Sequence, residues 1–424
     1  MNYLSCSPRQ LAGITMKEKE IAIAGYTYTL PDNRIALRPL EQRDSSKLLV
    51  YRNEQVTEDI YRNLSNHLPE NSLLVFNSTR VVEARILFQK PTGGQIEIFC
   101  LEPSDRYPDI SSAMLEKGKV YWNCLIGGAS KWKPGQVLSF SFEEGVLEAR
   151  FIARKTDCFE IAFSWLPQDL SFAEVLHKAG NIPLPPYIKR QVEAGDAERY
   201  QTIYARQDGS VAAPTAGLHF TDKIFKQLEE KNIRSLFLTL HVGAGTFRPV
   251  KSSTMGEHEM HAEFIDVPLK LLEELLHEPE HFCTAVGTTS LRTLESLYWL
   301  AWAIKRYQAD PANGHFELDQ WFSWENRDAT LERKQALETL IEYMRKKELD
   351  RLVTKTRLLI MPGYSFRMVD ALVTNFHQPQ STLLLLVAAF IGDQWRSIYD
   401  YALEHEFRFL SYGDGCLLFR KEGR

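Results

Sequence analysis

Residues 284–295, TAVGTTSLRTLE, decide the fold class of this chain. Thr284–Val286 predict a short buried strand, residues 287–290 a polar turn, and the residues from Leu291 onward a helix. The same alternation of strand, polar turn and helix runs through residues 237–277 before it. Alternating strands and helices are typical of α/β folds, so we expect an α/β architecture for this part of the chain.

Upstream, residues 85–165 show a different pattern. Gly-Gly and Pro-Gly pairs separate short runs with strand character, and several short strands in one segment predict a small antiparallel β-barrel. We therefore expect a large mixed α/β domain, residues 1–84 and 166–424, with a small antiparallel β-barrel domain inserted at 85–165. The strand predicted for Ser72–Phe76 belongs to the large domain. The candidate barrel strands are Ile86–Phe88, Gln95–Leu101, Tyr121–Ile126, Val137–Phe142, Gly145–Ala153 and Cys158–Phe163.

Residues 302–355 differ again, with charges of alternating sign along a helical pattern from Thr330 to Arg351. We expect this segment to be a helical insertion that packs on the large domain, with a tRNA-contacting role as the alternative, and Leu358–Met361 to be a strand after it. The longest apolar run, Leu383–Ile391, is shorter than the roughly 18 residues that a membrane-spanning helix needs. It predicts a buried core segment and no membrane partner.

Composition narrows the function classes. The 50 Lys and Arg against 55 Asp and Glu give a net charge of −5, which excludes a generally basic nucleic-acid binder. A local basic lip stays open, because Lys189, Arg190, Arg199, Arg206 and Lys251 surround a proline-rich segment. Six scattered cysteines predict free thiols, and the chain starts without an apolar signal region, so we expect a cytoplasmic location.

Five stretches of small and polar residues follow or flank predicted strands. Small residues let a backbone approach a ligand, and hydroxyls, amides and imidazoles supply directed hydrogen bonds. In open α/β sheets such residues collect at the carboxyl ends of strands, where ligands bind. We therefore expect one site that is built from several segments. The stretches are 77–80, 210–221, 240–249, 286–295 and 370–382.

Other chemistries receive less support. Neither of the two Gly-x-Gly sequences continues as a dinucleotide-binding fingerprint, and no Walker A lysine motif occurs. His258, His261 and Glu263 have metal-ligand spacing only if they lie on a helix, so a metal-dependent hydrolase stays an alternative. Arg80, Arg85, Arg248 and Arg292 lie in or beside the polar stretches. Each suits a phosphate or carboxylate ligand, or equally a surface salt bridge.

Ten stretches of this chain resemble the S-adenosylmethionine:tRNA ribosyltransferase-isomerase family of the queuosine pathway. They are long, and they extend from the first third of the chain almost to its end, which a shared generic fold does not explain. They read LLVFNSTRVVEAR (73–85), GNIPLPPYIKR (180–190), ERYQTIYA (198–205), GSVAAPTAGLHFT (209–221), TLHVGAGTFRPV (239–250), HEMHAEF (258–264), AVGTTSLRTLES (285–296), PGYSF (362–366), VDALVTNFHQPQSTLLLLVAAF (369–390) and FRFLSYGDG (407–415).

The resemblance implies an enzyme that needs no cofactor. S-adenosylmethionine is then a substrate that donates its ribosyl part to 7-aminomethyl-7-deazaguanine in tRNA. The product is epoxyqueuosine in tRNA, and adenine and methionine leave. The partners implied are tRNA and S-adenosylmethionine, and we expect a monomer. The family's architecture, a large α/β domain with a small inserted β-barrel, agrees with the pattern described above.

The residues of the polar stretches fit this chemistry. The sulfonium acidifies the adjacent C5′ hydrogens, so a general base of ordinary strength suffices, and the acceptor amine must be neutral to attack. We expect catalytic groups at His241, His377, His219 and Asp370, with Glu295 as another candidate carboxylate, and no metal. Arg292 or Arg248 is expected to hold the methionine carboxylate, unless Arg292 pairs internally with Glu295 or Asp370. The predicted substrate-binding residues are Asn77, Thr79, Arg80, Thr215, Arg248, His261, Thr288, Thr289, Arg292 and Asn375.

The chain also departs from the family pattern. Ser78 stands where an Asp is usual, Gln380 where a Lys is commoner, and the segment 302–355 is longer than the usual connection. These departures leave open a family member that acts on a different acceptor. A tRNA-binding protein that kept the fold without catalysis is a further alternative.

Overall fold

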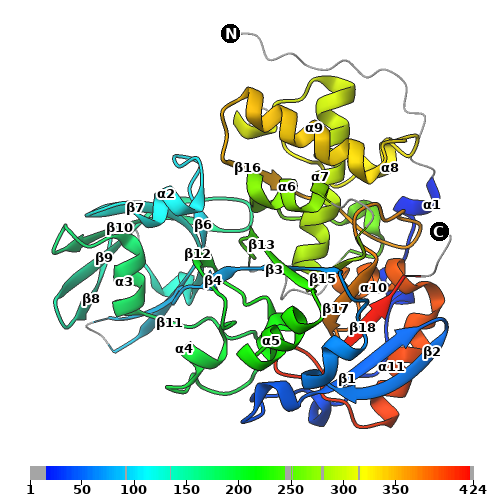
Figure 1. The fold of residues 1–424 in the computed structure, drawn as a ribbon. Coiled ribbons are helices and arrows are strands. Elements are labelled where there is room, and N and C mark those ends of the chain that lie inside the picture. Colours follow the sequence, from blue (N-terminus) through cyan, green and yellow to red (C-terminus); the bar gives the residue numbers. More distant parts are fainter. Residues whose placement is uncertain are drawn as a thin grey trace.

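The computed structural model describes residues 16–90, 93–133, 135–243, 250, 252–277, 281–313 and 316–420. These residues form a mixed α/β structure with a nine-stranded, a seven-stranded and a two-stranded sheet. The seven-stranded sheet forms the lobe on the left of Figure 1, and the nine-stranded sheet crosses the larger lobe. The mixed α/β class expected from the sequence is therefore present.

The nine-stranded sheet sets the position of the polar stretches. Its strands β13, β3, β15 and β17 are mutually parallel, so their carboxyl ends meet at one edge. β14 runs antiparallel to β13, and β18 runs antiparallel to β17, so the amino ends of β14 and β18 reach the same edge. The order is β16 (Arg351–Thr356), β14 (Glu263–Pro268), β13 (Arg234–Leu240), β3 (Leu73–Asn77), β15 (Cys283–Val286), β17 (Ala371–Asn375), β18 (Gly415–Phe419), β1 (Lys47–Arg52) and β2 (Gln55–Ile60).

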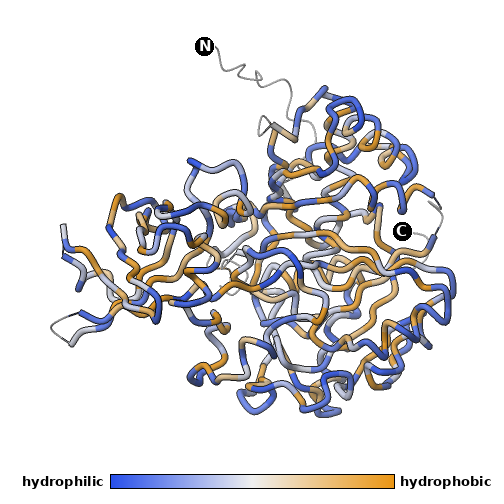
Figure 2. The backbone as a smooth tube through the Cα atoms, turned by 60° about the vertical axis from the view of Figure 1, so that its left-hand side comes forward, coloured by the Kyte–Doolittle hydropathy of each residue, from blue (hydrophilic) through white to orange (hydrophobic). Residues whose placement is uncertain are grey.

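Both faces of this sheet are covered, which is why β3 is apolar throughout. Leu73 and Val75 pack with α7 (Thr288–Tyr307), α10 and α11 in one core cluster. Leu74 and Phe76 point to the other face and pack with α5. Side chains of a strand alternate between faces, so a strand buried on both sides needs apolar residues at successive positions. Figure 2 shows these strands as hydrophobic segments inside the larger lobe.

The turn between β15 and α7 depends on Gly287. This residue has φ 91°, a backbone conformation that side chains with a Cβ rarely adopt. The turn brings Thr288 and Thr289 to the carboxyl edge of the sheet at the first positions of α7. The helix therefore begins three residues before the predicted Leu291.

The seven-stranded sheet is antiparallel, curled, and formed mainly by the strand-rich segment of the sequence. Its order has β11 and β8 at the two ends, without a ladder between them, so the structure shows a curled sheet and not a hydrogen-bonded closed barrel. The sheet extends past residue 165, because α3 (Phe172–Ala179) packs on it and β11 pairs with β5. The order is β11 (Gly180–Asn181), β5 (Arg85–Gln89), β6 (Gln95–Pro103), β7 (Lys119–Gly127), β10 (Phe159–Leu166), β9 (Gly145–Arg154) and β8 (Val137–Phe142).

The segment 302–355 packs on the large sheet's helices, as expected. Leu337 and Leu340 of α9 (Arg333–Lys346) lie in the main core, and the indole N–H of Trp324 donates to the carbonyl of Leu359 at 3.0 Å. Two details of the prediction are wrong. The segment ends in β16, which pairs with β14 as an edge strand, and Leu358–Met361 is buried but belongs to no strand.

The predicted apolar core segment is α10 (Thr382–Ile391), which lies in the main core cluster. Among the helices that the structure describes, none is long and apolar enough to cross a membrane. The remaining named helices and strands are α1 (Met16–Lys19), α2 (Ile110–Met114), α4 (Asp196–Arg199), α5 (Asp222–Glu230), α6 (Leu269–His277), α8 (Phe322–Glu325), α11 (Trp395–Glu404), β4 (Thr79–Val81) and β12 (Gln207–Ser210).

Candidate active site

A pocket opens at the carboxyl edge of the nine-stranded sheet. It contains about 740 Å³ of empty space, including the part open to solvent. Segments that lie far apart in the sequence meet there, and four of the five polar stretches contribute to the lining, all except 77–80. The lining residues are Tyr187, Ala212–Ala216, Val242, Gly287–Thr289, Thr374–Gln378, Ser381, Leu383, Leu410 and Ser411.

His377 lies in the pocket wall directly after β17. Its Nε2 is 2.8 Å from the hydroxyl of Thr374, and its backbone N–H donates to the hydroxyl of Tyr399 at 3.0 Å. Within the described part of the chain, Nδ1 has no hydrogen-bond partner. Burial lowers the pKa of His377 to about 4, so the imidazole is neutral near pH 7. It is thus the one predicted catalytic imidazole in the lining of this pocket.

Thr215 and Asn375 face each other across the pocket wall. The Thr215 hydroxyl donates to Oδ1 of Asn375 at 2.8 Å. Behind Asn375, its Nδ2 lies 3.4 Å from Nε2 of His219. His219 is 3 % exposed and does not line the pocket, so the structure places this predicted catalytic residue in the supporting layer behind it.

Asn77 closes the sheet edge below the pocket. Its side chain donates to the carbonyl of Leu240 at 2.9 Å and accepts from the N–H of the same residue at 3.0 Å, which joins β3 to β13. It also donates to the Thr289 hydroxyl at 3.4 Å. Asn77 is fully buried and therefore positions Thr289, whereas Thr288 and Thr289 themselves line the pocket.

His241 and Thr79 lie on the other side of Val242, facing the curled sheet. The Thr79 hydroxyl is 3.3 Å from Nδ1 of His241, and burial lowers the pKa of His241 to about 4. His241 lines a second cleft between the two lobes, and Val242 lines both hollows. His377 and His241 therefore line two adjoining spaces, and His219 lines neither of them.

The second cleft also contains His261, but it does not bring the proposed metal ligands together. Residues 258–262 form no helix, so His258 and His261 lack the helical spacing that a ligand pair would use. His261 Nδ1 lies 3.9 Å from an Asp157 carboxylate oxygen. Within the described residues, no group of three or more His, Cys, Asp or Glu side chains is placed to hold a metal.

Of the two arginines expected at the methionine carboxylate, the structure describes only Arg292. Arg292 forms an ion pair with Glu263, a partner that the sequence analysis did not name, and burial lowers the pKa of Arg292 to about 10. A role as carboxylate ligand stays a prediction. Arg248 lies outside the described residues. Arg80 is exposed and pairs with Asp208 at 3.7 Å, away from the pocket lining.

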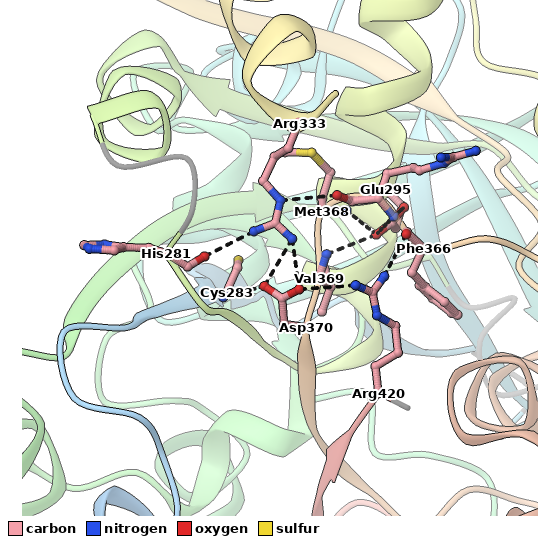
Figure 3. A network of polar contacts seen from close by, with 10 residues as sticks. His281, Cys283, Glu295, Arg333, Phe366, Met368, Val369, Asp370 and Arg420 are labelled. Atoms are coloured by element: carbon pink, nitrogen blue, oxygen red, sulfur yellow. Dashed lines mark hydrogen bonds and ion pairs between the residues drawn. The ribbon is translucent and has the colours of Figure 1, made fainter. Parts of the chain in front are cut away.

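Asp370, predicted to be catalytic, lies at the opposite edge of the sheet. It precedes β17, whose other end reaches the pocket, and a five-residue strand spans about 16 Å. Its carboxylate accepts two hydrogen bonds from Arg333 and one from the Cys283 N–H, and it contacts Arg420 (Figure 3). Asp370 is therefore a structural anchor between α9, β15 and the C-terminal strand, and we remove it from the site.

Glu295 belongs to the same network and is also not in the pocket. It is completely buried on α7, and its carboxylate accepts hydrogen bonds from the Tyr364 hydroxyl and from the backbone N–H groups of Arg367, Met368 and Val369. Figure 3 shows Glu295 beside Met368 and Val369. The carboxylate holds the loop that leads into β17.

The sequence analysis missed two lining residues, Tyr187 and Ser411. Their hydroxyl groups are 2.6 Å apart, and they close one side of the pocket. Tyr187 follows a proline-rich segment and Ser411 precedes β18, so neither follows a parallel strand. Both lie within the stretches that resemble the family. That resemblance is the only signal in the sequence that could have indicated them.

The substituted positions have limited contact with the pocket. The Ser78 hydroxyl donates to the Leu238 carbonyl at 3.1 Å within the sheet. Gln380 is exposed, and its N–H donates to the carbonyl of Tyr26. Neither residue lines the pocket, although Gln378 does.

One arginine of the predicted basic lip is engaged in an ion pair within the fold. Arg190 forms two short hydrogen bonds with the buried Asp196, at 2.6 and 2.7 Å, so it is not free for a phosphate. Arg199 lies instead beside Arg43 at a small hollow that shares Ser411 with the pocket.

Fold and site together define an α/β protein with a multi-segment polar pocket at the carboxyl edge of its sheet. A model of the queuosine biosynthesis protein family matches residues 23–418. Two proteins named S-adenosylmethionine:tRNA ribosyltransferase-isomerase are similar over 94 % of this chain. The one from Thermosipho melanesiensis is 36 % identical with 99 % of its length covered, and the one from Caulobacter sp. is 38 % identical with 96 % covered.

A crystal structure of an S-adenosylmethionine tRNA ribosyltransferase from Thermotoga maritima is 28 % identical, with 93 % of this chain and 99 % of that chain covered and a TM-score of 0.44. The family match and the two full-length relatives settle the assignment. The chain belongs to the queuosine biosynthesis protein family, and it is an enzyme of that family.

Proposed function

We propose that this enzyme transfers and isomerises the ribosyl part of S-adenosylmethionine onto 7-aminomethyl-7-deazaguanine in tRNA. The product is epoxyqueuosine in tRNA, with release of adenine and methionine and no cofactor. The observation that carries the proposal is the pocket that joins residues 212–216, 287–289 and 374–378. Its small residues leave room for a ligand, and its hydroxyl, amide and imidazole groups supply directed hydrogen bonds.

The ionisation of His377 supports a role in proton transfer. A histidine acts as a base only when neutral, and burial keeps His377 neutral near pH 7. Its Nδ1, which has no hydrogen-bond partner among the described residues, is the candidate acceptor for a proton from the carbon beside the sulfonium. There the positive charge already weakens the C–H bond. A sheltered pocket also favours the neutral form of the acceptor amine.

Incubation with S-adenosylmethionine and precursor-bearing tRNA tests this proposal. We expect free adenine in the supernatant and epoxyqueuosine in the digested tRNA, both measured by mass spectrometry. His377→Gln should abolish both products without loss of thermal stability near pH 7, and the exposed His277→Gln is the matched control. Adenine release without tRNA modification would indicate a different acceptor. Absence of both products from the wild type would contradict the proposal.

For the architecture, we propose that residues 85–165, together with α3 and β11, act as an inserted domain that faces the tRNA. We further propose that the enzyme acts as a monomer in the cytoplasm. The cleft between the lobes contains about 1540 Å³ of empty space, including the part open to solvent, and it adjoins the pocket through Val242. A nucleotide held in this cleft would therefore lie next to the donor site.

Arg43 and Arg199 are the expected tRNA phosphate contacts. Both line the hollow beside the pocket, and each is held by backbone carbonyls: Arg43 donates to Gln201 at 3.0 Å and Arg199 to Glu41 at 3.2 Å. Neither guanidinium has a carboxylate ion-pair partner within the described residues. Two guanidinium groups that line the same hollow favour an anion between them.

Reversing both charges, Arg43→Glu with Arg199→Glu, should weaken tRNA binding by ~10-fold at moderate salt and reduce the salt dependence of the affinity, because fewer counterions are released. Filter binding at several salt concentrations measures both. Lys346→Glu with Lys347→Glu, at the distant end of α9, makes the same change in net charge and should have little effect. Equal losses in the two double variants would exclude a phosphate site at the hollow.

A further inference from the structure

The direction of each hydrogen bond behind the pocket can be assigned from its fixed end. Nδ1 of His219 lies 3.3 Å from the carbonyl oxygen of Arg43, which can only accept, so Nδ1 carries the proton. Burial lowers the pKa of His219 to about 4, so the ring is neutral and its Nε2 has no proton. Nε2 must therefore accept from the amide Nδ2 of Asn375, 3.4 Å away.

A second acceptor fixes the same amide independently. Nδ2 of Asn375 also lies 3.4 Å from the carbonyl oxygen of Asp414, which again can only accept. The amide therefore has one orientation, with Oδ1 toward Thr215. Because Oδ1 is an acceptor, the Thr215 hydroxyl must donate to it, at 2.8 Å. Any other hydroxyl orientation would bring two acceptors together at this short distance.

We propose that Thr215 presents a pure hydrogen-bond acceptor to the pocket and selects a donor group of S-adenosylmethionine, either a ribose hydroxyl or the adenine amino group. Thr215 lines the pocket and its hydroxyl proton is already engaged by Asn375, so its oxygen can offer only lone pairs to a ligand. Asn375, in the pocket wall, and His219, behind it, act as positioning residues that set this polarity. The inference rests on the proposed function and adds to it the polarity of one contact.

Kinetics with donor analogues test the contact. Thr215→Val keeps the shape of the side chain but removes the acceptor, so the KM for S-adenosylmethionine should rise ~10-fold, the usual loss for one hydrogen bond, with kcat changed less. Thr215→Ser keeps the hydroxyl and should restore the KM. The 2′-deoxy, 3′-deoxy and 6-desamino analogues identify the donor group. The analogue that lacks this donor group should bind the wild type weakly, and its KM should not rise further in Thr215→Val.

The positioning chain has a separate readout. Asn375→Asp puts a carboxylate oxygen against Nε2 of His219, which should draw a proton onto that nitrogen and raise the pKa of His219 by more than one unit in an NMR titration. The KM should rise in parallel, because the new charge disturbs the fixed hydroxyl. Misfolding would instead move the pKa of all the buried histidines, His241 and His377 included, from about 4 toward the value of an unfolded histidine. A shift confined to His219 therefore distinguishes the new carboxylate from misfolding.

Distinct outcomes separate this inference from the proposed function. Two results with an active wild type would overturn the acceptor role alone. One is an unchanged KM for S-adenosylmethionine in Thr215→Val. The other is a KM that rises further in Thr215→Val for every analogue. A His219 pKa unaffected by Asn375→Asp would overturn the positioning chain. A wild type that releases no adenine and modifies no tRNA would overturn both the proposed function and this inference.

Discussion

Glu295→Gln is expected to lower the free energy of unfolding by about 1–3 kcal/mol, the usual cost of leaving a buried hydrogen-bond donor without a partner. All four groups around the carboxylate are donors: the Tyr364 hydroxyl and three successive backbone N–H groups. A glutamine of the same shape would turn its NH₂ group toward at least one of them and leave a buried donor unpaired. Urea unfolding followed by circular dichroism measures the loss.

Glu342→Gln, on the exposed face of α9, is the control and should change the unfolding midpoint little. The loop that Glu295 holds leads into β17, whose far end carries Asn375 and His377. We therefore expect folded Glu295→Gln to keep part of its activity at low temperature. Full stability with abolished adenine release would instead place Glu295 in the reaction.

Acidification should destabilise this protein steeply between about pH 6.5 and 4. Burial lowers the pKa of His219, His241 and His377 to about 4, whereas an unfolded histidine titrates near 6.5. Over that window the unfolded chain binds more protons than the folded one, so the free energy of unfolding falls as the pH falls. Each histidine contributes up to about 3 kcal/mol over the full window, and urea midpoints measured at several pH values report the sum.

The contribution of one histidine is isolated by comparing how stability depends on pH in a variant and in the wild type. The stability of His241→Gln should depend on pH less steeply than that of the wild type, by close to one proton between pH 6 and 5. The exposed His277→Gln should leave the slope unchanged. Parallel curves for wild type and His241→Gln would mean that His241 titrates in the folded protein as it does in the unfolded chain.

Local patterns in the sequence were sufficient for much of the fold. The buried strand at residues 73–77, the antiparallel strands between 85 and 165 and the helix after Gly287 each carry their own signal: apolar runs, turn pairs, or a glycine followed by helix formers. The strand at 351–356 carries none. Its sequence, RLVTKT, has no regular alternation of polar and apolar residues, and it directly follows a segment with a helical charge pattern. Only the structure shows the alternating burial of an edge strand.

The sequence by itself also determined that a polar pocket would form from several segments, because small and polar residues follow strands whose carboxyl ends must share an edge. Only the tertiary structure decided which side chains reach it. Asp370 and Asn375 lie in one polar stretch, yet they stand at opposite ends of a strand. His219 contacts Asn375 and Arg292 pairs with Glu263, because buried polar groups need partners. Those partners come from distant elements that no local pattern specifies.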